Sequence, residues 1–334
     1  MTRMLQVAGR RLILMTVIAA ALSGCAGQQV LNAFTPQRGL EKAINLSYGD
    51  HPRQRMDIYS PAGASEAPVV VFFYGGSSRE GSKDLYEFVA QALTSRGFVA
   101  VVPDYRVYPD VQFPAFIEDA AGAVAQARQV VHRYGGDPDK LFIMGHSAGA
   151  HLAAMLATDG RYLQAVGGSR AWLRGFIGLS GPYDFTPIKD SQIRAVFGPE
   201  SEHEKAQPVN YVDGQVPPTL LLHGENDTVV YANNSRDLAQ RIAEEGGRPT
   251  LVIYPKMSHQ KMIAVFGAPL RGLSDAVDKV ASFIREQARK PRPGASAGPA
   301  AARPAVSSDY SFETRPIDDE DPRPAETRPE PVEP

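Results

Sequence analysis

Continuous apolar runs alternate with amphipathic stretches along most of the chain. The apolar runs predict buried strands at 69–73, 98–102, 141–144, 174–179, 218–222 and 250–254. Apolar residues at helical spacing predict helices at 83–95, 114–134, 148–158, 234–245 and 272–288. Strands that alternate with helices in this way predict an α/β fold, with a mostly parallel central sheet covered by helices on both faces.

The folded domain is expected to cover residues 43–288. It begins with two short alternating segments, 43–48 and 54–59, which predict an antiparallel hairpin. The connections at 159–172 and 182–212 are longer than simple loops, and they predict a small cap over the functional site.

The N-terminal segment has the pattern of an export signal. Three arginines and no acidic residue accompany an apolar run at 12–22, which is shorter than the roughly 20 residues of a spanning helix. The run ends in Leu22-Ser23-Gly24-Cys25, which resembles a bacterial lipobox. The resemblance implies that 1–24 is a lipoprotein signal peptide, that Cys25 carries the lipid, and that 25–42 is a tether between Cys25 and the domain.

Ordinary secretory cleavage near Ala19–Ala21 is the alternative, and it would leave Cys25 as a free thiol. In the lipoprotein interpretation, Ala26 favours the periplasmic face of the outer membrane, because an aspartate there is the usual signal for inner-membrane retention. At the other end, residues 289–334 are rich in proline and charge and poor in large apolar residues. They cannot bury enough surface to offset chain entropy, so we expect a disordered tail.

Composition narrows the possible partners. The chain of 334 residues has 35 basic and 37 acidic residues and a formal charge of −2. Without a basic run, it gives no indication of a nucleic-acid partner. Its single cysteine cannot form an internal disulfide or a cysteine-rich metal site.

Two glycine-containing turns predict the reactive centre. Gly145-His146-Ser147-Ala148-Gly149 joins a predicted strand to a predicted helix, which is the context of a nucleophile elbow with Ser147 as the nucleophile. Tyr74-Gly75-Gly76-Ser77 directly follows another buried strand, where backbone N–H groups can stabilise an oxyanion. The predicted oxyanion hole comprises Gly75, Gly76, Ser77 and Ala148.

A serine nucleophile needs a base and an acid that orients the base. His259 follows the last predicted strand, and Asp227 follows the strand before it, which gives the chain order Ser, acid, His. Asp184, after the strand at 174–179, is the alternative acid. No step of this chemistry calls for a metal or an organic cofactor.

These motifs resemble the esterase and lipase branch of the α/β-hydrolases, in particular bacterial carboxylesterases related to isoprenylcysteine methylesterases and kynurenine formamidases. The resemblance rests on MDIY, FFYGGS, GHSAGAHLA, HGENDTVV and the His259 loop. Tyr74 and Ser78 depart from the His-Gly-Gly-x-Trp pattern of the formamidases. The resemblance implies a serine carboxylic-ester hydrolase that forms an acyl-enzyme on small-molecule esters with short acyl chains. The alternatives are an amidase or acyltransferase with the same three residues, and a catalytically silent, membrane-anchored binding module.

Overall fold

The computed structural model describes residues 24–291, which lie within one compact unit. The predicted signal peptide up to residue 23 and the predicted tail from 292 onward lie outside the described residues. Within them, no helix is both long enough and apolar enough to cross a membrane.

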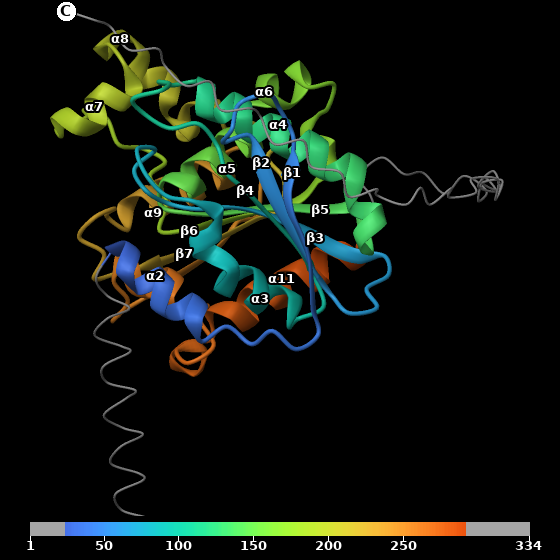
Figure 1. The fold of residues 1–334 in the computed structure, drawn as a ribbon. Coiled ribbons are helices and arrows are strands. Elements are labelled where there is room, and N and C mark those ends of the chain that lie inside the picture. The colour runs from blue at the N-terminus through green and yellow to red at the C-terminus, as the bar shows by residue number, and fades with distance from the viewer. Residues whose placement is uncertain (1–23, 292–334) are drawn as a thin grey trace, which may run out of the picture. The chain divides into compact units, whose positions relative to one another are not determined.

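An eight-stranded sheet, in the order β1-β2-β4-β3-β5-β6-β7-β8, forms the centre of the described chain (Figure 1). The strands are β1 (Leu40–Ser47), β2 (Arg55–Pro61), β3 (Ala67–Phe73), β4 (Val99–Pro103), β5 (Gly136–His146), β6 (Leu173–Leu179), β7 (Thr219–Gly224) and β8 (Thr250–Tyr254). β2 runs antiparallel to β1 and β4, and the pairs from β4 to β8 are parallel. The apolar runs therefore form buried parallel strands, and 43–59 forms the expected hairpin.

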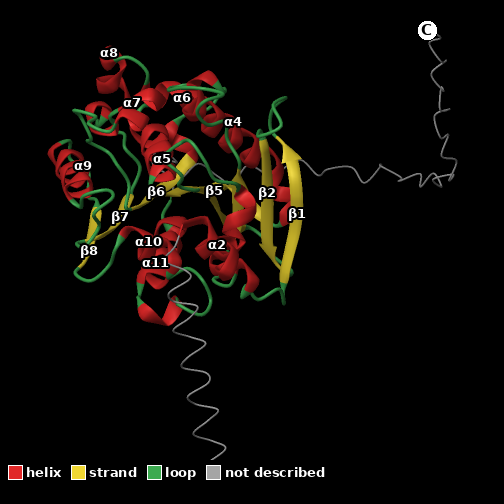
Figure 2. Ribbon diagram, turned by 60° about the vertical axis from the view of Figure 1, so that its left-hand side comes forward, coloured by secondary structure: helices red, strands yellow, loops and turns green. Residues whose placement is uncertain are grey.

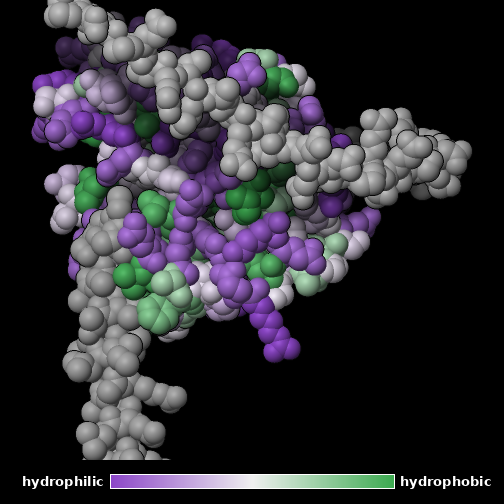
Figure 3. Space-filling model, in the orientation of Figure 1, coloured by the Kyte–Doolittle hydropathy of each residue, from purple (hydrophilic) through white to green (hydrophobic). Residues whose placement is uncertain are grey.

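Helices cover both faces of this sheet (Figures 1 and 2). They are α2 (Gly24–Ala33), α3 (Glu87–Thr94), α4 (Ala115–Val130), α5 (Ala148–Thr158), α6 (Gly160–Ala165), α7 (Ser191–Phe197), α8 (Glu200–His203), α9 (Asn233–Glu244), α10 (His259–Ala264) and α11 (Ala276–Arg289). α3 and α11 pack together on one face, whereas α4 and α5 pack together on the other. The exterior shown in Figure 3 is mostly hydrophilic, with small separate hydrophobic areas.

The parallel register brings the two glycine-containing turns together. Phe73, at the end of β3, pairs with Gly145 in β5, so the segment after β3 and the segment after β5 leave the sheet side by side. β6 lies on the other side of β5 and pairs Leu179 with His146. The carboxyl ends of parallel strands lie at the same edge of the sheet. This register therefore places both glycine-containing turns, and with them the predicted reactive centre, at that edge.

The segment predicted to be a tether is folded, and this part of the domain prediction is wrong. Residues 24–33 form α2, and β1 starts at Leu40, inside the predicted tether of 25–42. α2 packs on α3 and α10, and Leu31 is only 1% exposed. Burying a leucine stabilises a fold by about 1.5–3 kcal/mol, and this burial contributes to holding the segment in place.

Candidate active site

Ser147 lies at a sharp turn between β5 and α5. Its φ of 55° and ψ of −126° are unusual for a residue with a side chain, and such strain is common where a reactive group must project from a turn. Its N–H donates a 3.0 Å hydrogen bond to the carbonyl oxygen of Leu179, which fixes the turn to β6. A Cβ on Gly145 would lie 2.1 Å from the carbonyl oxygen of Gly149, so only glycine permits the turn.

The structure brings Ser147, His259 and Asp227 into one chain of hydrogen bonds. His259 Nδ1 lies 2.8 Å from Asp227 Oδ2, and His259 Nε2 lies 2.8 Å from Ser147 Oγ. A carboxylate only accepts, so Nδ1 carries the proton and donates to Asp227. Nε2 is then the acceptor, and the Ser147 hydroxyl donates to it, as a base that removes the hydroxyl proton requires.

Asp227 lies in the loop after β7, where its side chain is buried and accepts several hydrogen bonds. It is 3% exposed, and its Oδ1 accepts from the N–H groups of Val229 at 3.0 Å and Val230 at 2.9 Å. Burial favours the protonated carboxyl, but hydrogen bonds from His223 and His259 outweigh it and hold the pKa of Asp227 well below its usual range. The carboxylate therefore stays ionised and fixes the orientation of the His259 ring.

The alternative acid lies elsewhere. The structure leaves the Asp184 side chain exposed, and the Asp184 N–H donates to Asn234 Oδ1 at 3.0 Å. Asp227 occupies the position beside His259. His259 itself is the first residue of α10, rather than part of the open loop that the sequence predicts.

Comparison with known proteins identifies the family. A family described as BD-FAE matches residues 56–242, which is more than half of the chain. The chain belongs to the BD-FAE family. The match includes the predicted nucleophile elbow (145–149), the predicted oxyanion loop (74–77) and Asp227. His259 lies beyond it.

Named relatives of this BD-FAE chain are esterases. It is 28% identical to isoprenylcysteine alpha-carbonyl methylesterase from Arabidopsis thaliana, over 73% of this chain and 62% of that protein. It is 30% identical to esterase LipC from Mycobacterium tuberculosis, over 58% of this chain and 53% of LipC. The chain thus spans less than two thirds of the length of these relatives.

The solved structures confirm the predicted α/β-hydrolase fold. Esterase B from Lactobacillus rhamnosis superposes with a TM-score of 0.67 at 19% identity, over 84% of this chain and 95% of that chain. At this level of identity, the likeness shows the fold. The sequence motifs resemble those of isoprenylcysteine methylesterases, and such a methylesterase is among the relatives found.

The predicted oxyanion residues meet Ser147 at one wall of a pocket. Gly75, Gly76 and Ser77 line it together with Ser147, and a Cβ on Gly75 would lie 2.9 Å from Cβ of Ser147. Ala148 begins α5, so its N–H lies in the first turn and is not used within the helix. The segment after β3 and the start of α5 therefore both lie next to Ser147.

A buried polar network holds the oxyanion loop from behind. Tyr74 is fully buried, and its hydroxyl donates to Asp104 Oδ1 at 2.6 Å and accepts from Arg53 Nη2 at 3.0 Å. The Tyr105 hydroxyl donates to the carbonyl oxygen of Tyr74 at 2.7 Å, and the two rings stack at 4.8 Å. Burial raises the pKa of the Tyr74 hydroxyl well above its usual value, so it remains a donor. Tyr74 thus supports the loop and does not line the pocket.

A buried ion pair anchors the segment that follows this loop. Lys83 Nζ lies 3.0 Å from a carboxylate oxygen of Asp57 on β2, and their side chains are 3% and 2% exposed. The backbone N–H of Lys83 also donates to Asp104 Oδ1 at 2.7 Å. Asp104 follows a predicted strand, and its position favours capping of its own loop over lining or bracing the pocket. The sequence gave no sign of the contributions of Arg53 and Lys83.

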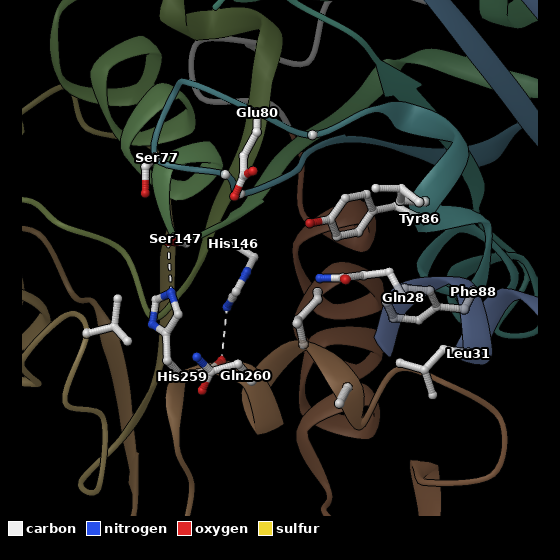
Figure 4. Close-up of a pocket in the computed structure, with 17 residues that line it drawn as sticks. Gln28, Leu31, Ser77, Glu80, Tyr86, Phe88, His146, Ser147, His259 and Gln260 are labelled. Carbon is white, nitrogen blue, oxygen red and sulfur yellow. Dashed lines mark hydrogen bonds between the residues drawn. The ribbon is translucent and has the colours of Figure 1, made fainter. Parts of the chain in front are cut away.

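The ring of His146 lies beside the ring of His259 (Figure 4). The two rings are 4.8 Å apart, and His146 Nε2–H donates to the carbonyl oxygen of His259 at 3.1 Å. Burial and the nearby His259 lower the pKa of His146 to about 3, so it stays neutral. The neutral ring holds the backbone of His259 at the start of α10.

The pocket at Ser147 is a cavity of about 230 Å³. Besides the residues above, it is lined by Gln28 and Leu31 of α2 and by Tyr86, Phe88, Gln260, Ile263 and Ala264 (Figure 4). No residue of 159–172 or 182–212 lines it, although these segments form short helices as expected of a cap. The outer wall comes instead from α2, in a segment whose polar composition gave little indication of a helix.

In the described part of the chain, no three His, Cys, Asp or Glu residues are grouped to hold a metal ion.

Proposed function

We propose that the chain is a serine carboxylic-ester hydrolase for small-molecule esters with short acyl groups. The observation that carries this proposal is the continuous hydrogen-bond chain from Ser147 Oγ through His259 to Asp227. The esterase names of its relatives support an ester as the substrate. A cavity of about 230 Å³ favours a small acyl group.

In this mechanism Ser147 Oγ attacks the acyl carbon as His259 Nε2 takes the hydroxyl proton. The carbonyl oxygen becomes an oxyanion, which the N–H groups of the oxyanion loop and Ala148 stabilise. A preorganised donor of this kind lowers the barrier by roughly 2.7–4 kcal/mol. The imidazolium of His259, stabilised by Asp227, then gives its proton to the leaving alcohol. Water repeats these steps on the acyl-enzyme and releases the carboxylic acid, restoring Ser147.

Labelling with a fluorophosphonate probe tests the proposal directly. We expect the probe to modify Ser147 in the wild type, together with turnover of p-nitrophenyl acetate, and we expect both to be lost in Ser147→Ala. Ser95→Ala, which changes an exposed serine, is the matched control and should keep both. Labelling that persists in Ser147→Ala would refute the proposal. Wild-type turnover of aryl amides instead of esters would favour an amidase.

We also propose that the N-terminal segment exports the chain and that Cys25 carries a lipid anchor in the outer membrane. The support is the lipobox-like sequence Leu22–Cys25 after a basic start and a short apolar run. Growth with radiolabelled palmitate should label the wild type in the membrane fraction. Cys25→Ser should remain unlabelled. A labelled Cys25→Ser chain, or an unlabelled wild type, would contradict this assignment.

A further inference from the structure

A second histidine, His223, contacts the loop that carries Asp227. It is the penultimate residue of β7 and is fully buried. Its Nε2 lies 2.8 Å from the carbonyl oxygen of Val230 and 3.4 Å from Oδ2 of Asp227. Neither oxygen can donate, so Nε2 carries the proton and donates it, mainly to the closer carbonyl oxygen. His223 therefore holds the loop through Val230 and also faces the carboxylate directly.

Ser235, in the first turn of α9, fixes the tautomer of His223. Its Oγ is fully buried and lies 2.7 Å from His223 Nδ1. Within residues 24–291, this nitrogen is the one side-chain hydrogen-bond partner of the hydroxyl, so the hydroxyl donates its proton there. Nδ1 is therefore unprotonated, and the ring is neutral with its proton on Nε2. The ring thus connects α9 to the loop after β7.

Val230 connects His223 to the carboxylate. Its N–H donates to Oδ1 of Asp227 at 2.9 Å, while its carbonyl oxygen accepts from His223. Both polar backbone groups of Val230 are therefore bonded, and the loop that carries Asp227 is tied to the end of β7. A small misplacement of a catalytic group can cost much of the rate, so a fixed carboxylate matters for the orientation of His259.

The position of His223 gives it no direct part in the chemistry. It does not line the pocket at Ser147, and both of its ring nitrogens face protein partners. Its Nε2–H faces Oδ2 of Asp227, the same oxygen that accepts from His259. Any effect of His223 on the reaction must therefore pass through Asp227 and the loop that carries it.

We propose that His223, with its tautomer fixed by Ser235, is a positioning residue that holds Asp227 against His259. This inference rests on the proposed esterase function and deepens it, because it adds two residues outside the pocket to those on which the rate depends. The hydrogen-bond chain of the active site then extends from Ser147 through His259, Asp227 and His223 to α9.

Substitutions at both ends of this connection test it, on the full chain with p-nitrophenyl acetate. His223→Phe keeps a ring but removes the donor, and it should lower kcat about tenfold, which corresponds to one hydrogen bond. KM should stay within about twofold, because neither His223 nor Ser235 lines the pocket. His223→Gln supplies an amide N–H in place of Nε2–H and should restore kcat to within about threefold of the wild type. Ser235→Ala releases the tautomer and should lower kcat about threefold.

The same substitutions in an Asp227→Asn background separate positioning from general damage to the fold. Residues that act as a unit are non-additive, so His223→Phe and Ser235→Ala should each change kcat by less than about twofold there. Thr219→Val is the matched control. It removes a buried hydroxyl at the opposite end of β7, which donates to the carbonyl oxygen of Pro217 at 2.8 Å, and it should keep the wild-type kcat.

Three results would each overturn the inference. They are an unchanged kcat in Ser235→Ala, a loss of the same factor in the Asp227→Asn background, and a loss in Thr219→Val equal to that in His223→Phe. If His223→Phe does not fold, Ser235→Ala in the two backgrounds decides the question. A wild type that neither hydrolyses p-nitrophenyl acetate nor labels at Ser147 would instead refute the esterase function itself.

Discussion

The Nδ1–H of His259 donates to Oδ2 of Asp227 across 2.8 Å, while the other carboxylate oxygen is held by two backbone N–H groups. This arrangement fixes both the tautomer of the histidine and the plane of its ring. Nε2 is thereby left as an acceptor that faces Ser147.

Asp227→Asn should therefore lower kcat by about 10⁴-fold, because an amide can donate to the ring and favour the wrong tautomer. The steady-state rate on p-nitrophenyl acetate measures this loss. Asp184→Asn, at the exposed alternative position, is the control and should stay within about twofold of the wild type. Equal losses in the two variants would contradict the assignment of Asp227.

Tyr74→Phe tests the support behind the oxyanion loop. It removes the hydroxyl that joins Asp104 and Arg53. We expect kcat to fall about tenfold with little change in KM, because the loosened N–H groups matter more to the oxyanion than to the bound ester. Tyr231→Phe, at a residue that is 69% exposed, should leave both constants unchanged. An unaltered kcat in Tyr74→Phe would show that the loop holds its shape without this network.

The buried pair of Lys83 and Asp57 predicts a non-additive effect on stability. Lys83→Met leaves a buried carboxylate unpaired and should destabilise the fold by about 3–5 kcal/mol. Adding Asp57→Asn removes the charge but keeps an acceptor for the N–H of Asn45, so the double variant should recover much of that loss. Urea unfolding of the four proteins measures the coupling. A double variant as unstable as the sum of the single variants would argue against a paired charge.

Acid stability depends on a histidine away from the reactive centre. His151 is 1% exposed, and burial lowers its pKa to about 4. Its Nε2–H donates to the carbonyl oxygen of Ala206 at 2.7 Å. The unfolded chain therefore binds a proton at this residue below about pH 6.5, whereas the folded chain resists protonation down to about pH 4.

Stability should thus fall as the pH drops through this window, by up to about 1.4 kcal/mol per pH unit from His151 alone. His151→Phe should flatten that slope in denaturant titrations between pH 6.5 and 4, even if the variant is less stable overall. His132→Gln, at an exposed histidine, should keep the wild-type slope. An unchanged slope in His151→Phe would show that the ring is not buried in its neutral form.

The sequence predicted the strands and the order of the three central side chains because these depend on local patterns. Continuous apolar runs marked the parallel strands, and the strand–Gly-x-Ser-x-Gly–helix context marked Ser147. Asp227 and His259 followed from their places after successive strands.

Contacts between elements that lie far apart in the sequence were harder to predict. The short polar segment around α2 has weak helical signals, and only its packing against α10 and α3 shows that it forms a pocket wall. Likewise, Arg53 donates to the Tyr74 hydroxyl and the N–H of Lys83 donates to Asp104. Both hydrogen bonds join residues that lie far apart in the sequence. The cap was expected from loop length alone, which does not say over which part of the molecule a loop folds.

Helix α2 lies before the family match at 56–242, whereas Ser147, Asp227 and the oxyanion loop lie within it. In the proposed enzyme, the bond-breaking groups and one wall of the pocket therefore come from separate stretches of the chain. α2 could then be redesigned or exchanged with the reacting groups left untouched. Two proteins that share the BD-FAE segment and the histidine that follows it could perform the same reaction and still differ in the esters that they accept.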